Sequence, residues 1–288
     1  MKIDCDWHMH SRHSPCGRQG TPLALLAEQA RASGLSAFGI SDHLHCRLSL
    51  PALRACRAEY DALEDKRGFH FGLEVSCLRR SDLERNDARG AEGSIYGLQS
   101  DGPEGPLTVF LPEGLIEELN VEYVIGGAHW LLGAAKERDA AIRSYHRQNM
   151  FLASHPAVDI VAHPWWWMGA WKAPDRNFYP DLPWLGDFTV IPRSMHDEFA
   201  AAARENSKAV EINLHAILLN PQYPASFRGQ YVEYLAGLKE QGVTFSIGSD
   251  SHGPGYEAAL DRVQRDLEGL DLTEADLWKP GAGKKKWP

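Results

Sequence analysis

The sequence IDCDWHMH at residues 3–10 ends an apolar-rich run with two histidines, His8 and His10, separated by one residue. In a β-strand the side chains at positions i and i+2 point to the same side, so both imidazoles can reach one metal ion. A single His-x-His pair is weak evidence, because many such pairs arise by chance. The rest of the chain decides what this one means.

The same arrangement recurs along the chain. Other apolar runs also lead into residue types that bind metals: 37–41 into Asp42 and His43, 69–73 into Glu74, 121–128 into His129, 158–162 into His163, and 243–249 into Asp250 and His252. Any one of them could be an ordinary polar residue at a strand end. Together they predict parallel strands that deliver ligands from their carboxyl ends, as in an α/β barrel with a metal site at its mouth.

Helical patterns alternate with these runs. Apolar residues recur at helical spacing in the segments 21–34, 50–66, 195–206 and 227–241. Pro22 suits the first helical position of its segment, and a further strand is expected at 209–214. This alternation predicts parallel strands joined by right-handed crossovers, in one domain that spans residues 1–288.

Two long segments interrupt the alternation. Residues 79–112 are rich in charge, glycine and proline, and residues 164–193 are rich in tryptophan and proline. Both follow candidate ligands, so we expect inserted loops on the face that carries the site. Residues 281–288 are expected to form a short C-terminal tail.

Composition excludes some classes of function. The 288 residues carry a net charge of −9, which argues against a broad nucleic-acid surface. No apolar run is long enough for a membrane span, and no secretory signal is visible, so a cytoplasmic protein is expected. The five cysteines are irregularly spaced and predict free thiols.

The candidate ligands are too many for one tetrahedral zinc ion. Mixed imidazole and carboxylate ligation suits zinc, manganese or iron in a site that holds more than one metal.

The ordered motifs resemble those of the PHP (polymerase and histidinol phosphatase) family of metal-dependent phosphoesterases, in particular its histidinol-phosphatase-like members. The resemblance runs from Asp6 to about Gly253. It rests on the motifs HMH (8–10), SDH (41–43), the strand-end Glu74, GGAH (126–129), AHP (162–164), EIN (211–213) and SDSH (249–252). These motifs are specific for the family and not for a substrate.

The resemblance implies a distorted (β/α)7 TIM-like barrel with two or three divalent metal ions at the carboxyl ends of its strands. By motif, the first metal would be held by His8, His10, Glu74 and Asp250. Glu74 would bridge to a second metal held also by His129 and His163. A third would be held by His43 and His252.

Cys16 marks a departure from the family pattern. Several relatives have a histidine at this position of the third site. Cys16 could bind as a thiolate, which would favour zinc there. Alternatively, His13 could substitute from a turn away, or the third site could be weak or empty.

The implied mechanism uses a hydroxide shared by two cations as the nucleophile, because metal coordination lowers the pKa of water toward about 7. Asp250 or His252 could manage the proton, and Asp42 is expected to orient a ligand imidazole. Arg193 has the best position to bind the substrate phosphate, and the other cationic candidates are Arg18, Lys136 and Arg138. For each of the four taken singly, a solvated surface charge is the favoured interpretation.

Other side chains of the predicted site face have open roles. The tryptophans Trp165, Trp166, Trp167 and Trp171 could form an aromatic wall for an apolar leaving group, or could be buried against the barrel. At least one should be structural, because three consecutive side chains cannot face the same way. Glu211 and Asn213 share a strand face and could touch substrate or only fill the barrel mouth.

The first functional hypothesis is a phosphoesterase that acts on a small phosphomonoester such as histidinol phosphate. A second is a metal-dependent hydrolase of amide or lactone bonds, since similar barrels use similar metal clusters. A third is a non-catalytic metal-binding module. Convergent arginine or lysine side chains near the metals would favour the first over the second.

Overall fold

The structure is a computed structural model, and it describes residues 2–16, 21–95, 98, 104–133, 137–166, 183–252 and 260–281. Its central element is a sheet of parallel strands in the order β1-β2-β4-β7-β8-β9-β10. These strands are β1 (Cys5–Met9), β2 (Ala37–Ile40), β4 (Phe69–Ser76), β7 (Tyr123–Gly127), β8 (Ile160–Ala162), β9 (Ala209–Asn213) and β10 (Thr244–Gly248).

The two ends of this sheet meet. Met9 forms a parallel bridge with Ser251, and the backbone N–H of Asp250 donates to the carbonyl of His8 at 2.7 Å. The short strand β3 (His43–Leu44) pairs with β4 beside β2. The predicted distorted (β/α)7 barrel is therefore confirmed, with the barrel nearly closed between its first and last strands.

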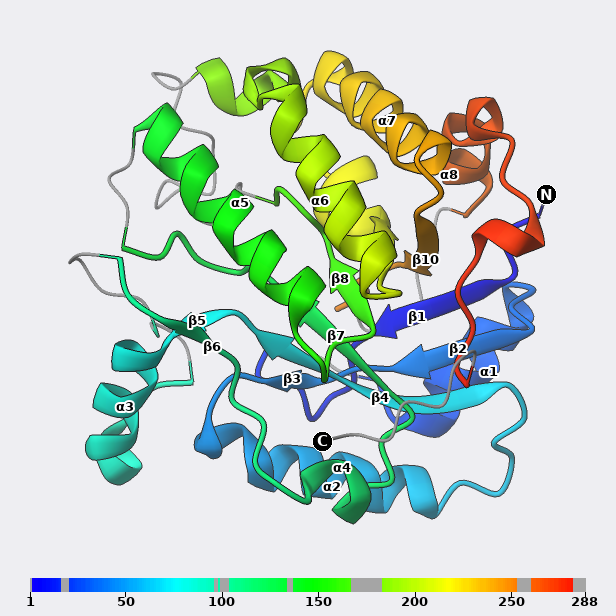
Figure 1. Ribbon diagram of the computed structural model, residues 1–288. Coiled ribbons are helices and arrows are strands. Elements are labelled where there is room, and N and C mark those ends of the chain that lie inside the picture. Colours follow the sequence, from blue (N-terminus) through cyan, green and yellow to red (C-terminus); the bar gives the residue numbers. More distant parts are fainter. Residues whose placement is uncertain are drawn as a thin grey trace.

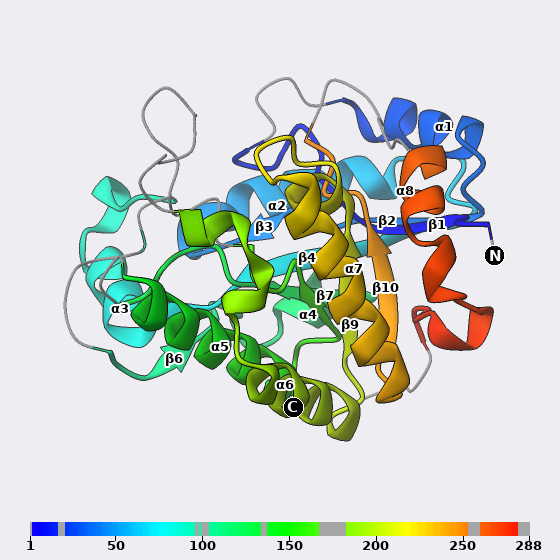
Figure 2. The same ribbon diagram turned by 90° about the horizontal axis from the view of Figure 1, so that it is seen from above.

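Helices follow the strands and cover the outside of the barrel. They are α1 (Leu23–Ala32), α2 (Leu50–Asp61), α4 (Leu115–Glu118), α5 (Arg138–Ser154), α6 (Arg193–Glu205), α7 (Ala225–Glu240) and α8 (Leu260–Asp266). Helices α5, α6 and α7 lie side by side on one flank, and α2 lies on the opposite side of the strands (Figure 1). The view from above shows the same ring of helices around the sheet (Figure 2).

Tyr123 fills the barrel interior below the site. Its hydroxyl donates to the carbonyl of Trp7 at 2.7 Å. A Cβ at Gly39 or Gly72 would lie 2.0 Å or 2.4 Å from atoms of the Tyr123 side chain, so only glycine leaves room for it. The strands are buried on both faces, which explains why their sequences are continuous apolar runs.

The segment 79–112 differs from the predicted loop. It contains α3 (Arg80–Ala88), and β5 (Leu78–Arg79) pairs with β6 (Leu107–Thr108) in a second, antiparallel sheet. The buried Arg79 side chain donates to Asp82, and this ion pair ties the start of α3 to β5. Charged residues that suggested a loop therefore stabilise a small lobe.

Two local predictions also need correction. Pro22 is the N-cap residue of α1 and not its first helical residue. Strand β4 continues to Ser76, so Glu74 lies inside the strand and not after it.

Within the described residues, no helix has the length and apolar character needed to cross a membrane.

Candidate metal centre

The barrel brings most of the predicted ligands together around Glu74. This carboxylate is completely buried at the mouth end of β4, and imidazoles approach it from several neighbouring segments. The side chains within 4 Å of its two oxygens include those of His8, His10, His43, His129 and His163.

One set of atoms has the spacing of ligands around a single ion. Nε2 of His8 lies 3.1 Å from Nε2 of His10, and these two nitrogens lie 3.3 Å and 3.6 Å from Oε2 of Glu74. Oδ1 of Asp250 lies 3.7 Å and 3.3 Å from the same two nitrogens. Tetrahedral ligands at about 2.0–2.1 Å from a zinc ion are about 3.3–3.5 Å apart. The ligand atoms of His8, His10 and Glu74 therefore fit one cation, and Asp250 lies beside the two histidines.

The other oxygen of Glu74 faces a second set. Its Oε1 lies 3.0 Å from Nε2 of His129 and 3.3 Å from Nε2 of His163. Gly127 lies at the back of this set, and a Cβ there would approach Cε1 of His129 at 2.6 Å and Oε1 of Glu74 at 2.8 Å. The glycine of the GGAH motif thus provides the space in which these side chains converge.

Cys16 joins a third set. Ligand atoms of His10, Cys16, His43 and His252 all lie within 4.8 Å of one another. The alternative ligand His13 pairs instead with Glu59, through Nε2 and Oε2. Of the two candidates for this position, only the cysteine is brought to the histidines.

The unsatisfied atoms of the cluster fit a cation. Oε2 of Glu74 and Nδ1 of His43 lie 2.6 Å apart, yet both are buried without a hydrogen bond of acceptable geometry. Buried polar atoms are normally paired, and an imidazole lone pair beside a carboxylate oxygen is a typical donor set for a divalent ion.

The electrostatics favour the metal-binding protonation states of several ligands. Burial lowers the pKa of His10 and of His43 to about 3, so both imidazoles are neutral. Burial raises the pKa of Glu74, but neighbouring imidazoles outweigh this, among them His8, whose own pKa is raised, and they hold the pKa of Glu74 well below its usual value. Neutral imidazoles and ionised carboxylates are the forms that bind metals.

Glu211 is the main site residue whose role was not predicted. Its Oε1 accepts from Nδ1 of His8 at 2.6 Å, and its Oε2 accepts from the backbone N–H of His163 at 2.7 Å. Nδ1 of His8 must carry the hydrogen, which leaves Nε2 free to bind an ion. Glu211 is fully buried and holds His8 and the backbone of His163 in place through hydrogen bonds. The EIN motif alone could not show this role.

Ser76 and His45 also escaped prediction. The Ser76 hydroxyl lies 2.8 Å from Nδ1 of His129 and 2.6 Å from Nδ1 of His45. His45 lies two residues beyond the SDH motif, which was the only available signal. Asp42 accepts from the backbone and hydroxyl of Ser11, and its Oδ1 lies 3.9 Å from Nδ1 of His10. Asp42 thus holds the turn after the HMH motif.

Backbone geometry shows how the candidate ligands after two of the strands reach the site. Strand β10 ends at Gly248, and Asp250 has φ of 55°. His163 also has a positive φ, of 29°. Turns therefore aim these side chains at the site, and strand alternation does not.

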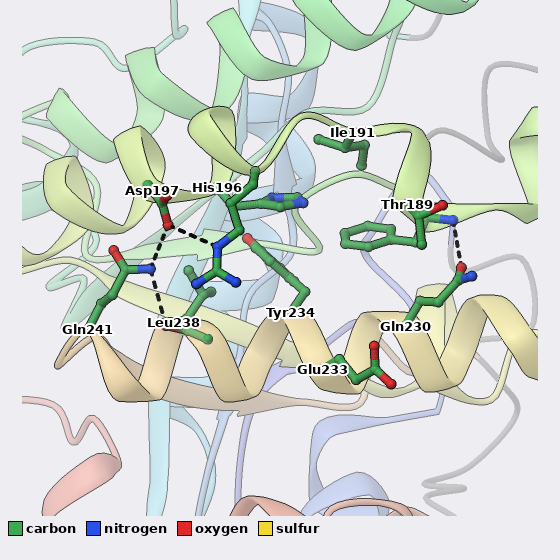
Figure 3. A pocket seen from close by; sticks show the side chains of 12 residues that line it. Thr189, Ile191, His196, Asp197, Gln230, Glu233, Tyr234, Leu238 and Gln241 are labelled. Carbon is green, nitrogen blue, oxygen red and sulfur yellow. Dashed lines mark hydrogen bonds and ion pairs between the residues drawn. The ribbon is translucent and has the colours of Figure 1, made fainter.

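Arg193 lies away from the cluster. It is the first residue of α6, its side chain is 76% exposed, and it pairs with Asp197. It lines an outer groove of about 370 Å³ between α6 and α7, together with His196, Tyr234 and Gln241 (Figure 3). None of the candidate ligands lines this groove, so its position does not support the predicted phosphate-binding role.

The other cationic candidates are not brought to the cluster either, where they are described. Arg138 begins α5 and pairs with the adjacent Asp139 at the surface. Arg18 and Lys136 lie outside the described residues.

The tryptophans divide between the two predicted roles. Trp165 is fully buried outside the barrel, where it contacts His146 and His196, so it is structural. Trp166 is half-buried, and its ring lies 5.1 Å from that of His163 and 6.2 Å from that of His129. Trp166 therefore borders the cluster. Trp167 and Trp171 lie outside the described residues.

Comparisons with known proteins agree with this geometry. No protein-family model matches the chain. A protein of Acetivibrio thermocellus named "Probable phosphatase" is 24% identical over 272 residues, which cover 94% of this chain and 89% of that protein.

Solved structures give the fold. A "putative histidinol phosphatase" from Listeria monocytogenes aligns with a TM-score of 0.58 and 12% identity, over 87% of this chain and 95% of that one. A citrate lyase from Burkholderia xenovorans aligns with a TM-score of 0.41 and 16% identity, over 93% of this chain and 77% of that one. In its barrel, its ordered ligand motifs and these relatives, the chain resembles the PHP phosphoesterases.

Proposed function

We propose that this protein is a metal-dependent phosphoesterase that hydrolyses a small phosphomonoester. The observation that carries the proposal is the placement of Glu74 between two sets of imidazoles, with Oε2 toward His8 and His10 and Oε1 toward His129 and His163. A carboxylate that serves two ions a few ångströms apart is the centre of two-metal phosphoryl-transfer sites.

The proposed cofactors are two or three divalent ions, namely zinc, manganese or iron. Bound there, they would polarise a phosphoryl oxygen and lower the pKa of water to near neutrality. His8, His10, Glu74 and Asp250 would hold the first ion, and Glu74, His129 and His163 the second. His43, Cys16 and His252 would hold a third, for which the cysteine favours zinc.

The protein side chains have distinct tasks in this reaction. Glu211 holds the His8 ring so that Nε2 faces the cluster. Asp250 and His252 are the proposed proton-transfer groups, because the His252 side chain is 36% exposed and its Nδ1 donates to the Asp250 carbonyl at 2.8 Å. His252 lies at the rim, where solvent can reach it, and Asp250 lies buried beside it.

The relatives' names support a phosphate substrate. Trp166 borders the cluster and is the proposed contact for the organic part of the substrate. Arg18 and Lys136 remain the proposed hydrogen-bond donors to the phosphate group of the substrate, since Arg193 and Arg138 pair with acidic neighbours elsewhere.

The test is metal removal and restoration, with phosphate release as the readout. The protein is stripped with a chelator, reloaded separately with zinc, manganese or iron, and assayed on a panel of small phosphomonoesters, histidinol phosphate included. We expect no release from the stripped protein and recovery with at least one metal.

A parallel panel of amides and lactones separates the alternative. Turnover of those substrates by metal-loaded protein that releases no phosphate would replace the proposal with an amide or lactone hydrolase. Metal binding without turnover on either panel would indicate a non-catalytic module.

A further inference from the structure

A line of hydrogen-bonding groups leads away from Glu74 through three segments of the barrel. Nε2 of His129 lies 3.0 Å from Oε1 of Glu74, and Nδ1 of the same ring lies 2.8 Å from the Ser76 hydroxyl. That hydroxyl also lies 2.6 Å from Nδ1 of His45. Ser76 is the last residue of β4, His129 follows β7, and His45 follows β3.

The chemistry of these groups fixes the direction of the line once an ion binds. An imidazole that binds an ion through Nε2 keeps its hydrogen on Nδ1, so His129 must donate through Nδ1. The acceptor in reach is Oγ of Ser76. A hydroxyl has one hydrogen, which Ser76 then donates to Nδ1 of His45.

Burial protects these hydrogen bonds from competition by water. Ser76 and His45 are 0% and 1% exposed, so bulk water does not compete for the hydrogen bonds. The His45 ring stacks on that of His43, with centroids 4.5 Å apart and planes at 28°, and it contacts Trp130 on another side. Packing therefore holds His45 in the orientation that Ser76 requires.

We propose that Ser76 and His45 are positioning residues that hold His129 in the tautomer whose Nε2 binds the second ion. The proposal rests on the metal centre proposed above and adds the groups that prepare one of its ligands. His129 needs such support because it lies beyond the end of β7, where strand pairing does not fix its side chain.

The first experiment measures zinc binding by calorimetric titration of the stripped full-length protein. Ser76→Ala removes the only acceptor of His129 in the line and should weaken the second zinc equivalent by about 10–100-fold, with the first little changed. His45→Leu leaves the hydroxyl in place and should have a smaller effect. His45→Asn places an amide oxygen where Nδ1 stood and should restore binding.

Ser246→Ala is the matched control. Ser246 is a buried serine on a barrel strand, and its hydroxyl has no hydrogen-bond partner among the described residues. Its substitution should leave both zinc equivalents unchanged.

A second measurement reads the tautomer directly. Long-range proton–nitrogen NMR spectra of the zinc-loaded protein should show His129 with its hydrogen on Nδ1 in the wild type and in Ser246→Ala. In Ser76→Ala the Nδ1 signal should shift or broaden. A structural defect elsewhere in the barrel would not produce this local signature.

The proposal is overturned if Ser76→Ala binds the second zinc as the wild type does, or if His129 carries its hydrogen on Nε2 in the loaded protein. It is also overturned if His45→Asn and His45→Leu weaken binding equally. A failure of the proposed function would look different, since zinc titrations and tautomers would follow the expectation while no phosphomonoester was hydrolysed.

Discussion

Nδ1 of His8 lies 2.6 Å from Oε1 of Glu211, and both side chains are completely buried. The second oxygen of Glu211 accepts from the backbone of His163 and from the side-chain amide of Asn213. One carboxylate on β9 thus orients a ligand on β1 and anchors the turn that carries a ligand after β8. A second acidic residue therefore supports the candidate metal centre beneath Glu74.

Glu211→Gln should weaken binding of the first ion by about 10–100-fold, because an amide can present its N–H₂ group to His8 and no longer fixes the required tautomer. Metal content after dialysis and calorimetric titration with zinc would measure the change. The control is Glu122→Gln, which alters a second Glu–His pair, with His70, at the amino-terminal ends of β4 and β7, opposite the mouth that carries the candidate ligands. Equal effects of both substitutions would contradict the role of Glu211.

Glu74→Gln should remove two ions together. The amide keeps the size of the side chain but loses the charge, and only one of its two end atoms can still bind a cation. We expect elemental analysis to show that the metal content falls at both sites, the one that includes His8 and the one that includes His129. Hydrolysis should be lost with it. Retention of either full metal content or activity would show that Glu74 does not bridge.

Gly127→Ala should disturb the second set of ligands. The added methyl group would lie 2.6 Å from Cε1 of His129 and 3.0 Å from Cε1 of His163, which forces one of the rings to move. Overpacking of this kind destabilises a protein by about 1–3 kcal/mol. Chemical denaturation of the metal-free protein would measure the loss of folding free energy, and zinc titration the loss of the second ion.

Gly229→Ala provides the comparison for that variant. Gly229 lies in helix α7, and in the part of the chain that the structure describes no atom lies within 4 Å of the added Cβ. Alanine is the better helix former, so this substitution should stabilise the protein by about 0.5–1 kcal/mol and leave metal binding unchanged.

Cys16 should bind its ion as a thiolate. Burial raises the pKa of the free thiol far above its usual value, so only a cation can hold the deprotonated form there. Cobalt-loaded protein is expected to show a thiolate-to-cobalt charge-transfer band in the near ultraviolet, and Cys16→Ser should abolish it. Cys77→Ala, which changes a buried core cysteine, should keep the band. A band that persists without Cys16 would assign it to another thiol.

Zinc affinity should rise with pH. Burial lowers the pKa of His8, but the carboxylates of Glu211, Glu74 and Asp250 outweigh burial and raise it well above the ordinary value of 6.5. The metal-free protein therefore keeps a proton on His8 above pH 6.5, and an ion must displace it. Calorimetry in buffers of different ionisation enthalpy should detect the released proton and a plateau in affinity above the pKa of His8.

The same shift has a consequence for the stability of the metal-free protein. A folded-state pKa above the unfolded value means that the charged His8 stabilises the fold fully below pH 6.5 and progressively less as pH rises through the folded pKa. Denaturation in the presence of chelator should show this decline, and Glu211→Gln should reduce it. A stability that increases over this range would contradict the sign of the His8 shift.

The sequence alone indicated where the parallel strands lie along the chain and which residues are the candidate ligands. Apolar runs of β type can be recognised in the sequence because parallel strands buried on both faces need continuous apolar side chains. The motifs lie toward the carboxyl ends of these runs. The positions of His8, His10, His129 and His163 relative to these runs therefore identify them as candidate ligands. The pairing of Cys16 with histidines was also foreseen as one of three options.

Only the tertiary structure decided which polar residues hold the candidate ligands in place through hydrogen bonds and which lie away from the site. Glu211, Ser76 and His45 act through hydrogen bonds between strands that are distant in sequence, and such contacts leave no local pattern. Arg193 had a suitable place in the chain order, but its helix carries it to the outer surface of the barrel. Periodicity specifies which face of an element is buried, whereas the closure of the barrel sets which side chains meet at its mouth.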